Sequence, residues 1–456
     1  HFIKLNNGKI NIIRYWELKF ATKDNYYKGS YEDAIAEFNE LFRDAVRIRL
    51  RADVPVAAYL SGGIDSSITT SFIKEIDPNV LQTFSVGFTE DEFDETSYQK
   101  IAAEYFNTNH TAIKISSKEI AENFPKVVWH SEFPLLRTSP SPMYSLSKEV
   151  RKNNIKVVIT GEGADELLAG YSIFKENKIR HFWAKDKNSK LRPLLLKKLY
   201  PYIAALQKVN PNALKLFFGY KLENTDSPIY SHLLRWNNTS NILNHLDKTF
   251  KDQLSGFDQY ERLLAGLNGN LDNLDPLAKA QYLEIVIFLS GYLLSSQGDR
   301  MGMANSVEGR YPFLDYRIIE FCAQLPPDYK MKGLKEKVLL KSLMKGRLPE
   351  EILNRPKQPY RAPILSSFLG SDVPEYVNEV LSEAEIKKAG IFSPDSVKRL
   401  LVKMKSGKAY SEIDNMALTA IISTQLLHKQ FIEDFRYLKM NELISYTLRS
   451  ESDFNN

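Results

Sequence analysis

Short apolar runs alternate with helix-compatible stretches over the first third of the chain. A continuous apolar run is typical of a strand buried on both faces, whereas an amphipathic helix repeats its apolar residues every three to four positions. Because the two patterns take turns, they predict an α/β fold, a parallel sheet with helices on both faces. The expected strands are Val56–Leu60, Thr83–Val86, Thr111–Ile115 and Val157–Thr160.

The pattern changes after residue 175. Strand signals nearly disappear and helical spacing dominates, for example over Leu277–Leu294 and Val338–Lys345. We therefore expect residues 21–456 to form one domain, with an α/β part at 21–175 and a mostly helical part at 176–456. The polar residues 441–456 are expected to fray.

The first residues have the pattern of a β-hairpin. Phe2–Trp16 contains two alternating runs around Asn7-Gly8, a dipeptide that favours a tight hairpin turn. A two-stranded hairpin is at best marginally stable alone in water. We therefore expect residues 1–20 to be the remnant of a larger upstream domain.

Composition narrows the range of partners. The 456 residues are 43% hydrophobic and 26% charged, as in ordinary globular proteins, and the net charge of +5 gives little support for nucleic acid binding. The densest basic stretch, Lys185–Lys198, is explained as well by a solvated helical face. We expect no nucleic acid partner, no apolar run of membrane length and no signal peptide. The single cysteine, Cys322, excludes an internal disulfide and a thiol zinc site, fits a small core residue, and suits a cytoplasmic protein.

The strand that ends at Leu60 continues into the loop Ser61-Gly-Gly-Ile-Asp-Ser66, and a helix-compatible stretch follows. Adjacent glycines let the backbone turn tightly and aim several N–H groups at one point, and the helix dipole adds to this field. The loop therefore predicts a socket for a phosphate chain. It lacks the lysine of a Walker loop, and its aspartate, Asp65, fits an anion site only if a divalent cation shares the site.

A second loop of this kind follows the last predicted strand and reads Gly161-Glu-Gly-Ala-Asp-Glu166. Three carboxylates crowded at the end of a buried strand are costly unless a cation or a reaction uses them. A solvated acidic cap on a helix would explain one acid, not three. Because ligands bind at the carboxyl ends of strands in open parallel sheets, we expect the two loops to face one site.

Together the two loops resemble the ATP-pyrophosphatase synthetase domain of the asparagine synthetase B family, the glutamine-hydrolysing type. The resemblance covers about residues 15–363 and is thin at 175–271 and after 365. It implies an adenine nucleotide alpha-hydrolase-like sheet. The further segments that resemble the family lie in order along the chain: Leu81–Phe88, Thr138–Tyr144, Asp299–Asp315, Gly333–Lys341 and Arg355–Arg361.

The resemblance also implies an activity. Such an enzyme uses ATP and Mg²⁺ to adenylate the side chain of aspartate, releases pyrophosphate and transfers ammonia, which the full-length enzyme takes from glutamine. The product is asparagine. An upstream glutaminase domain is implied for residues 1–20, and a homodimer is compatible with the family.

Site residues follow from the same resemblance. Glu162 is expected to act on the proton of ammonia and Lys337 on the departing pyrophosphate, while Asp65 and Asp165 would share Mg²⁺. For Leu60 and Val86, packing within the sheet explains the residues as well as nucleotide binding does. For Lys357, a position on the protein surface is as good an interpretation as a role in the site. Glu308 and Arg310 lie near the site by resemblance, although a structural ion pair is favoured. The expected ATP and pyrophosphate site consists of Leu60, Ser61, Gly62, Gly63, Asp65, Ser66, Val86, Gly161 and Lys357.

Other functions stay open. Ala164 stands where the family usually has serine, and Leu167-Leu-Ala169 replaces a more aromatic and glycine-rich run, so the acceptor is not fixed. The same chemistry on another carboxylate, as in β-lactam synthetase or a secondary-metabolite amidotransferase, is the main alternative. A tRNA-modifying ATP pyrophosphatase using sulfur transfer is disfavoured by the single cysteine. A non-catalytic scaffold is disfavoured by the intact acids and by Lys337.

Overall fold

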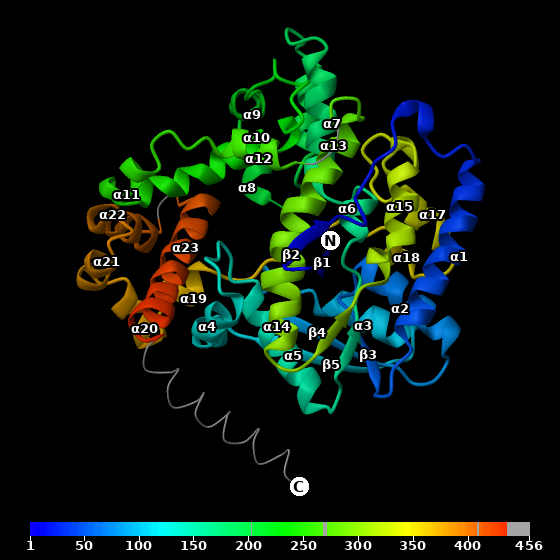
Figure 1. The fold of residues 1–456 in the computed structure, drawn as a ribbon, viewed down its shortest axis with the longest axis horizontal. Helices are drawn as coiled ribbons and strands as arrows, with labels where there is room; N and C mark the ends of the chain where they lie inside the picture. The colour runs from blue at the N-terminus through cyan, green and yellow to red at the C-terminus, as the bar shows by residue number, and fades with distance from the viewer. Residues whose placement is uncertain (202, 268–270, 408–409, 436–456) are drawn as a thin grey trace.

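The computed structural model describes residues 1–201, 203–267, 271–407 and 410–435. Its centre is an all-parallel sheet with the strand order β5-β4-β3-β6-β7 (Figure 1). The four strands predicted from the sequence are present, with ends within two residues of those expected. The bounds are β3 (Val56–Tyr59), β4 (Gln82–Phe88), β5 (Asn109–Ile115), β6 (Val157–Ile159) and β7 (Glu308–Arg310).

The edge strand β7 was not predicted. It is short and polar, and it exists because β6 offers it a parallel ladder in which Val157 lies opposite Glu308. An apolar pattern cannot reveal such a strand. The Nε atom of Arg310 lies 2.7 Å from Glu308 Oε1, and its guanidinium also donates to the carbonyls of Arg49 and Arg51. The favoured interpretation of this pair as structural therefore agrees with its contacts.

Helices cover both faces of the sheet, as predicted. Alternate residues of β3 and β6 enter two separate apolar clusters, Ala58 and Ile159 on one face and Ala57 and Val158 on the other. The first cluster includes side chains from α1 (Tyr31–Arg49), α2 (Ile64–Ile76) and α3 (Thr96–Tyr105), and the second includes α5 (Pro140–Lys152). α4 (Ser117–Ser131) packs beside α5.

The second half is mostly helical, which confirms the prediction. From α6 onward, most α-helices form a group above the sheet in Figure 1, a group around α23 at one end of the molecule, or a group beside α1, while α14 lies beside the sheet. They are α6 (Ala164–Leu167), α7 (Ser172–Ala184), α8 (Ala204–Gln207), α9 (Pro211–Phe218), α10 (Tyr230–Thr239), α11 (Lys248–Gln253), α12 (Gln259–Gly266), α13 (Pro276–Leu283), α14 (Arg300–Met303), α15 (Tyr316–Gln324), α16 (Pro327–Lys330), α17 (Val338–Leu343), α18 (Glu350–Leu353), α19 (Leu365–Leu369), α20 (Glu375–Val380), α21 (Glu383–Ala389), α22 (Pro394–Lys405) and α23 (Glu412–His428).

A π-helical segment, η4 (Glu284–Asp299), joins α13 to α14. Among the described residues, the continuous stretch Pro276–Met303 is the one helix long and apolar enough to cross a membrane, and half of its most apolar window is buried in the protein. The expectation that no apolar run reaches this length was therefore wrong. Within the fold, α13 packs against α7 and α10.

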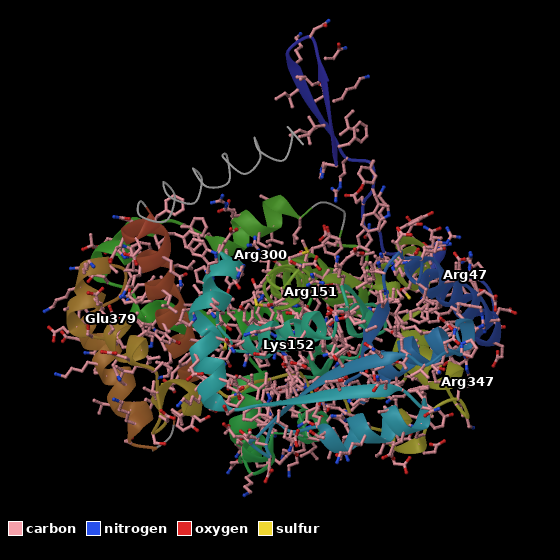
Figure 2. All side chains as sticks on the ribbon, turned by 90° about the horizontal axis from the view of Figure 1, so that it is seen from below. Arg47, Arg151, Lys152, Arg300, Arg347 and Glu379 are labelled. Carbon is pink, nitrogen blue, oxygen red and sulfur yellow. The ribbon has the colours of Figure 1, made fainter. Side chains whose placement is uncertain are left out.

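The predicted hairpin is present as β1 (Phe2–Asn6) and β2 (Lys9–Ile13), with left-handed backbone at Asn7 and Gly8 in the turn. Its side chains are exposed, and Figure 2 shows it standing away from the body of the molecule. Cys322 is buried in the core, as expected. The tail at 441–456 lies outside the described residues.

Candidate active site

The two predicted loops lie at the point where the strand order of the sheet reverses. Strand β3 pairs with β4 on one side and with β6 on the other, so the chain winds outward from β3 in two directions. Open α/β sheets bind ligands at this switch point, beyond the carboxyl ends of the strands. A Cβ atom on Gly161 would lie 2.8 Å from the carbonyl carbon of Asp65, which shows how closely the second loop approaches the first.

The first loop leaves its helix start available to an anion. The backbone of Gly62 is left-handed, with φ +70°, and Gly63 stands at the N-cap of α2 without a side chain to accept from the first N–H groups. The Ser66 hydroxyl accepts from the Ser61 N–H at 3.2 Å and donates to the Gly63 carbonyl at 3.2 Å. The loop is therefore a folded turn with its positive helix end facing the site.

Two carboxylates and two lysines meet between the loops. Lys337 Nζ lies 2.5 Å from Asp65 Oδ1 and 2.6 Å from Asp165 Oδ1. Lys357 Nζ also pairs with Asp165, and it lies 3.5 Å from Asp65 Oδ2. The structure thus brings all four predicted residues together, and Lys357 proves to be as central as Lys337.

Lys337 is held in this position by the surrounding backbone. Its side chain is 1% exposed, and its own backbone is left-handed at φ +52°, an uncommon conformation for a residue with a side chain. A Cβ atom on Gly170 would lie 1.9 Å from Asp165 Oδ1 and 2.2 Å from Lys337 Cε, so only glycine permits this approach. Such strain is characteristic of functional sites.

The four charges stabilise one another. Burial opposes ionisation of Asp165, but the two lysine ammonium groups outweigh burial and hold the pKa of Asp165 below its usual value. Burial likewise opposes the charge of Lys357, and the two aspartates raise the pKa of Lys357 despite it. Asp165 and Lys357 therefore favour their charged forms, and the cluster as a whole pairs two acidic with two basic side chains.

The donor set fits a magnesium ion with substrate phosphate. Asp65 and Asp165 supply carboxylate oxygens that already converge on one cation, the Lys337 ammonium. Mg²⁺ is usually held by one or two carboxylates together with water and phosphate oxygens. Within the described part of the chain, no group of three or more His, Cys, Asp or Glu side chains is arranged to hold a metal. An all-protein metal cage is therefore not formed by those residues.

Burial raises the pKa values of the remaining two acids of the second loop toward neutrality. Burial raises the pKa of Glu162 to about 7, against the opposing effect of Lys357, and the Thr160 hydroxyl donates to Glu162. Burial and the neighbouring Asp165 raise the pKa of Glu166 to about 8, and the Tyr171 hydroxyl donates to Glu166 at 2.8 Å. A carboxyl with a pKa near neutrality is suited to accept and return a proton.

Val86 lies in β4, and Leu60 directly follows β3. The Leu60 side chain is buried in the main apolar cluster, and its N–H donates to the Phe84 carbonyl at 2.9 Å. Val86 is half-buried and packs between two clusters. Both contacts agree with strand packing, and a role in nucleotide binding stays a prediction.

Sequence reasoning missed Arg355 and Glu95 as residues that support the first loop. Arg355 donates to the Gly62 carbonyl at 3.2 Å, pairs with Glu95, and lies 4.0 Å above the ring of Tyr98. Arg355 is the first residue of the segment Arg355–Arg361, which resembles the family. The sequence therefore showed this motif, but it did not show that Arg355 contacts the first loop.

Comparisons with known proteins agree with this geometry. The family model for asparagine synthase matches residues 37–429. Asparagine synthetase [glutamine-hydrolyzing] 1 of Bacillus subtilis is 31% identical over 384 residues, which is 80% of this chain and 56% of the relative. Amidase chyE of Penicillium rubens is 28% identical over 442 residues, 90% of this chain and 63% of the relative.

A putative asparagine synthetase of Mycobacterium tuberculosis is 28% identical over 432 residues, 92% of this chain and 61% of the relative. The chain therefore spans 56% to 63% of the length of these relatives. The family model covers most of the sequence, from within α1 to the end of α23. The chain therefore belongs to the asparagine synthase family.

Proposed function

We propose that this chain is an AMP-forming amide ligase that adenylates a carboxylate with ATP, releases pyrophosphate and transfers ammonia to the activated acyl group. Aspartate is the proposed acceptor and asparagine the product. The observation that carries this proposal is the convergence of Asp65, Asp165, Lys337 and Lys357 between a phosphate-type loop and an acidic loop.

The first step needs a clamp for a leaving group of high negative charge. The N–H groups at the start of α2 would bind the β and γ phosphates of ATP, and Lys337 and Lys357 would neutralise pyrophosphate as it departs. Asp65 and Asp165 would hold a magnesium ion, which supplies charge neutralisation to the phosphates when bound. Fixed positive groups cost no reorganisation at the moment of reaction, and the buried, strained Lys337 fits this requirement.

The second step needs an unprotonated amine. Ammonia is mostly protonated at neutral pH, and Glu162, with a pKa of about 7, would take a proton from it and release that proton later. The Bacillus subtilis relative is named a glutamine-hydrolyzing asparagine synthetase. We propose that glutamine hydrolysis is likewise the source of the ammonia used by this site.

A second acceptor class is favoured by one feature. Tyr171, Phe288 and Tyr292 form an aromatic row, with ring centroids 6.5 Å and 5.5 Å apart, and Lys357 Nζ lies 5.8 Å from the Tyr171 ring. Such a wall beside the charged cluster suits an acceptor bulkier than aspartate. The relatives named amidase chyE and amidase chry2 are consistent with this alternative.

Pyrophosphate release tests both acceptors. The chain is incubated with ATP, Mg²⁺, ammonia and one carboxylate at a time, with aspartate, glutamate, N-acetylaspartate and aryl carboxylates as the panel. Aspartate-dependent pyrophosphate and equimolar asparagine would support the first proposal. If an aryl carboxylate is the one acceptor that causes pyrophosphate release, it replaces aspartate as the proposed acceptor. If no carboxylate in the panel causes pyrophosphate release, the ligase function is refuted.

A further inference from the structure

A small cavity has Glu162 in its wall. Its volume is about 20 Å³, which is space for one water-sized molecule. Its lining is largely apolar and includes Met143, Val158 and Val307. The polar side chains on its border come from β3, the end of β6, the acidic loop, η4 and the segment after β7, and they belong to Tyr59, Thr160, Glu162, Asp299 and Tyr311. Because Glu162 is one wall, a molecule in this cavity contacts the carboxyl proposed to act on ammonia.

Tyr311 sets the size of this cavity. A Cβ atom on Gly309 would lie 2.3 Å from Tyr311 Oη and 2.8 Å from its Cζ, so the ring fills the space that a side chain at residue 309 would need. On its other side the Tyr311 hydroxyl donates to Asp299 Oδ1 at 2.6 Å. The position of the Tyr311 ring thus depends on the absence of a side chain at Gly309 and on the hydrogen bond to Asp299.

We propose that Tyr311, seated against Gly309 and held by Asp299, restricts the nucleophile that reaches Glu162 to a molecule of the size of ammonia. This inference rests on the proposed ligase function. Ammonia has one heavy atom, as water does, and fits a space of this volume, whereas a primary amine needs room for at least one more carbon.

The test is competition between two nucleophiles. The wild-type chain and its variants receive ATP, Mg²⁺, the acceptor and an equal mixture of ammonia and methylamine, and mass spectrometry gives the ratio of N-methylamide to amide. Tyr311→Val should raise this ratio about tenfold, the usual discrimination gained from one methyl-sized space. Tyr311→Phe keeps the ring and should leave the ratio near that of the wild type.

Tyr316→Val is the matched control, because Tyr316 is 59% exposed and lies outside the cavity. Tyr311→Leu repeats the comparison with more buried volume if Tyr311→Val does not fold. A wild-type chain that forms both amides equally well, or Tyr311 variants with an unchanged ratio, would overturn the proposal while leaving the ligase intact. Failure of the wild type to form any amide would instead refute the ligase and the inference with it.

Discussion

Replacing Lys337 by methionine is expected to destabilise the protein and to make its stability depend on Mg²⁺. Methionine keeps the unbranched stem but removes the ammonium that contacts Asp65 and Asp165. The cluster then holds two carboxylates against one lysine, Lys357, with Asp165 in a buried position.

The size of the effect follows from this charge count. Removing one partner of a buried ion pair costs about 3–5 kcal/mol because the other charge stays buried. Lys357 still neutralises one carboxylate, so we expect a loss near the lower end, about 3 kcal/mol. A divalent cation bound by the two aspartates would replace the missing charge and recover much of this loss.

Urea unfolding with and without MgCl₂ measures both parts, with activity playing no role. The exposed Lys345→Met is the matched control, because it removes a lysine charge outside the cluster. Unfolding of Lys337→Met at the same urea concentration as the wild type would refute the predicted loss of stability. The magnesium assignment is wrong if MgCl₂ stabilises Lys337→Met no more than it stabilises the wild type.

Three further predictions concern the two loops. Asp65→Asn should abolish ATP–pyrophosphate exchange in a protein that is folded by circular dichroism, and normal exchange would contradict its role at the phosphate site. Glu162→Gln should lower amide formation by about a hundredfold while sparing exchange more than Lys337→Ala does; equal losses in both assays would move Glu162 into the phosphate clamp. Because the pKa of Glu162 rises from 4.5 to about 7 on folding, the folded state binds the extra proton, so its contribution to stability is lost as pH rises from 4.5 through about 7. Glu162→Gln should flatten that part of the pH–stability curve, and an unchanged slope would show that Glu162 is not the titrating group.

The fold was predictable wherever burial dominates local structure. The four apolar strands were found because residues such as Val157 and Ile159 must be buried on a two-sided sheet. Strand β7 was missed because Glu308–Arg310 is placed by a hydrogen-bond ladder rather than by apolar content. The helical spacing over Leu277–Leu294 was found, but the helix continues to Met303 through the polar residues Ser295–Arg300, which have no apolar pattern to reveal it.

The site was predictable to the extent that chemistry is local. The acids and glycines of the two loops are each readable within a few residues of a strand end. Lys337 contacts Asp65 across 272 residues of chain, and Lys357 contacts Asp165 across about two hundred. Sequence resemblance pointed to both lysines, but only the folded arrangement shows that they share the same two carboxylates.

The pairing of these lysines with the aspartates has a consequence for ATP binding. In the protein alone, each positive group already has a negative partner, so the buried cluster carries little net charge. ATP with Mg²⁺ brings both a cation suited to carboxylates and phosphates suited to ammonium groups. We infer that Asp65 and Asp165 would hold the metal and that Lys337 and Lys357 would pair with the phosphates, so that no new unpaired charge would be buried. A site built this way would be stable without ligand and would present positive charge to the proposed leaving pyrophosphate. Either component alone would leave two protein charges unpaired, so ATP and Mg²⁺ should bind with positive cooperativity, each raising the affinity for the other by the same factor.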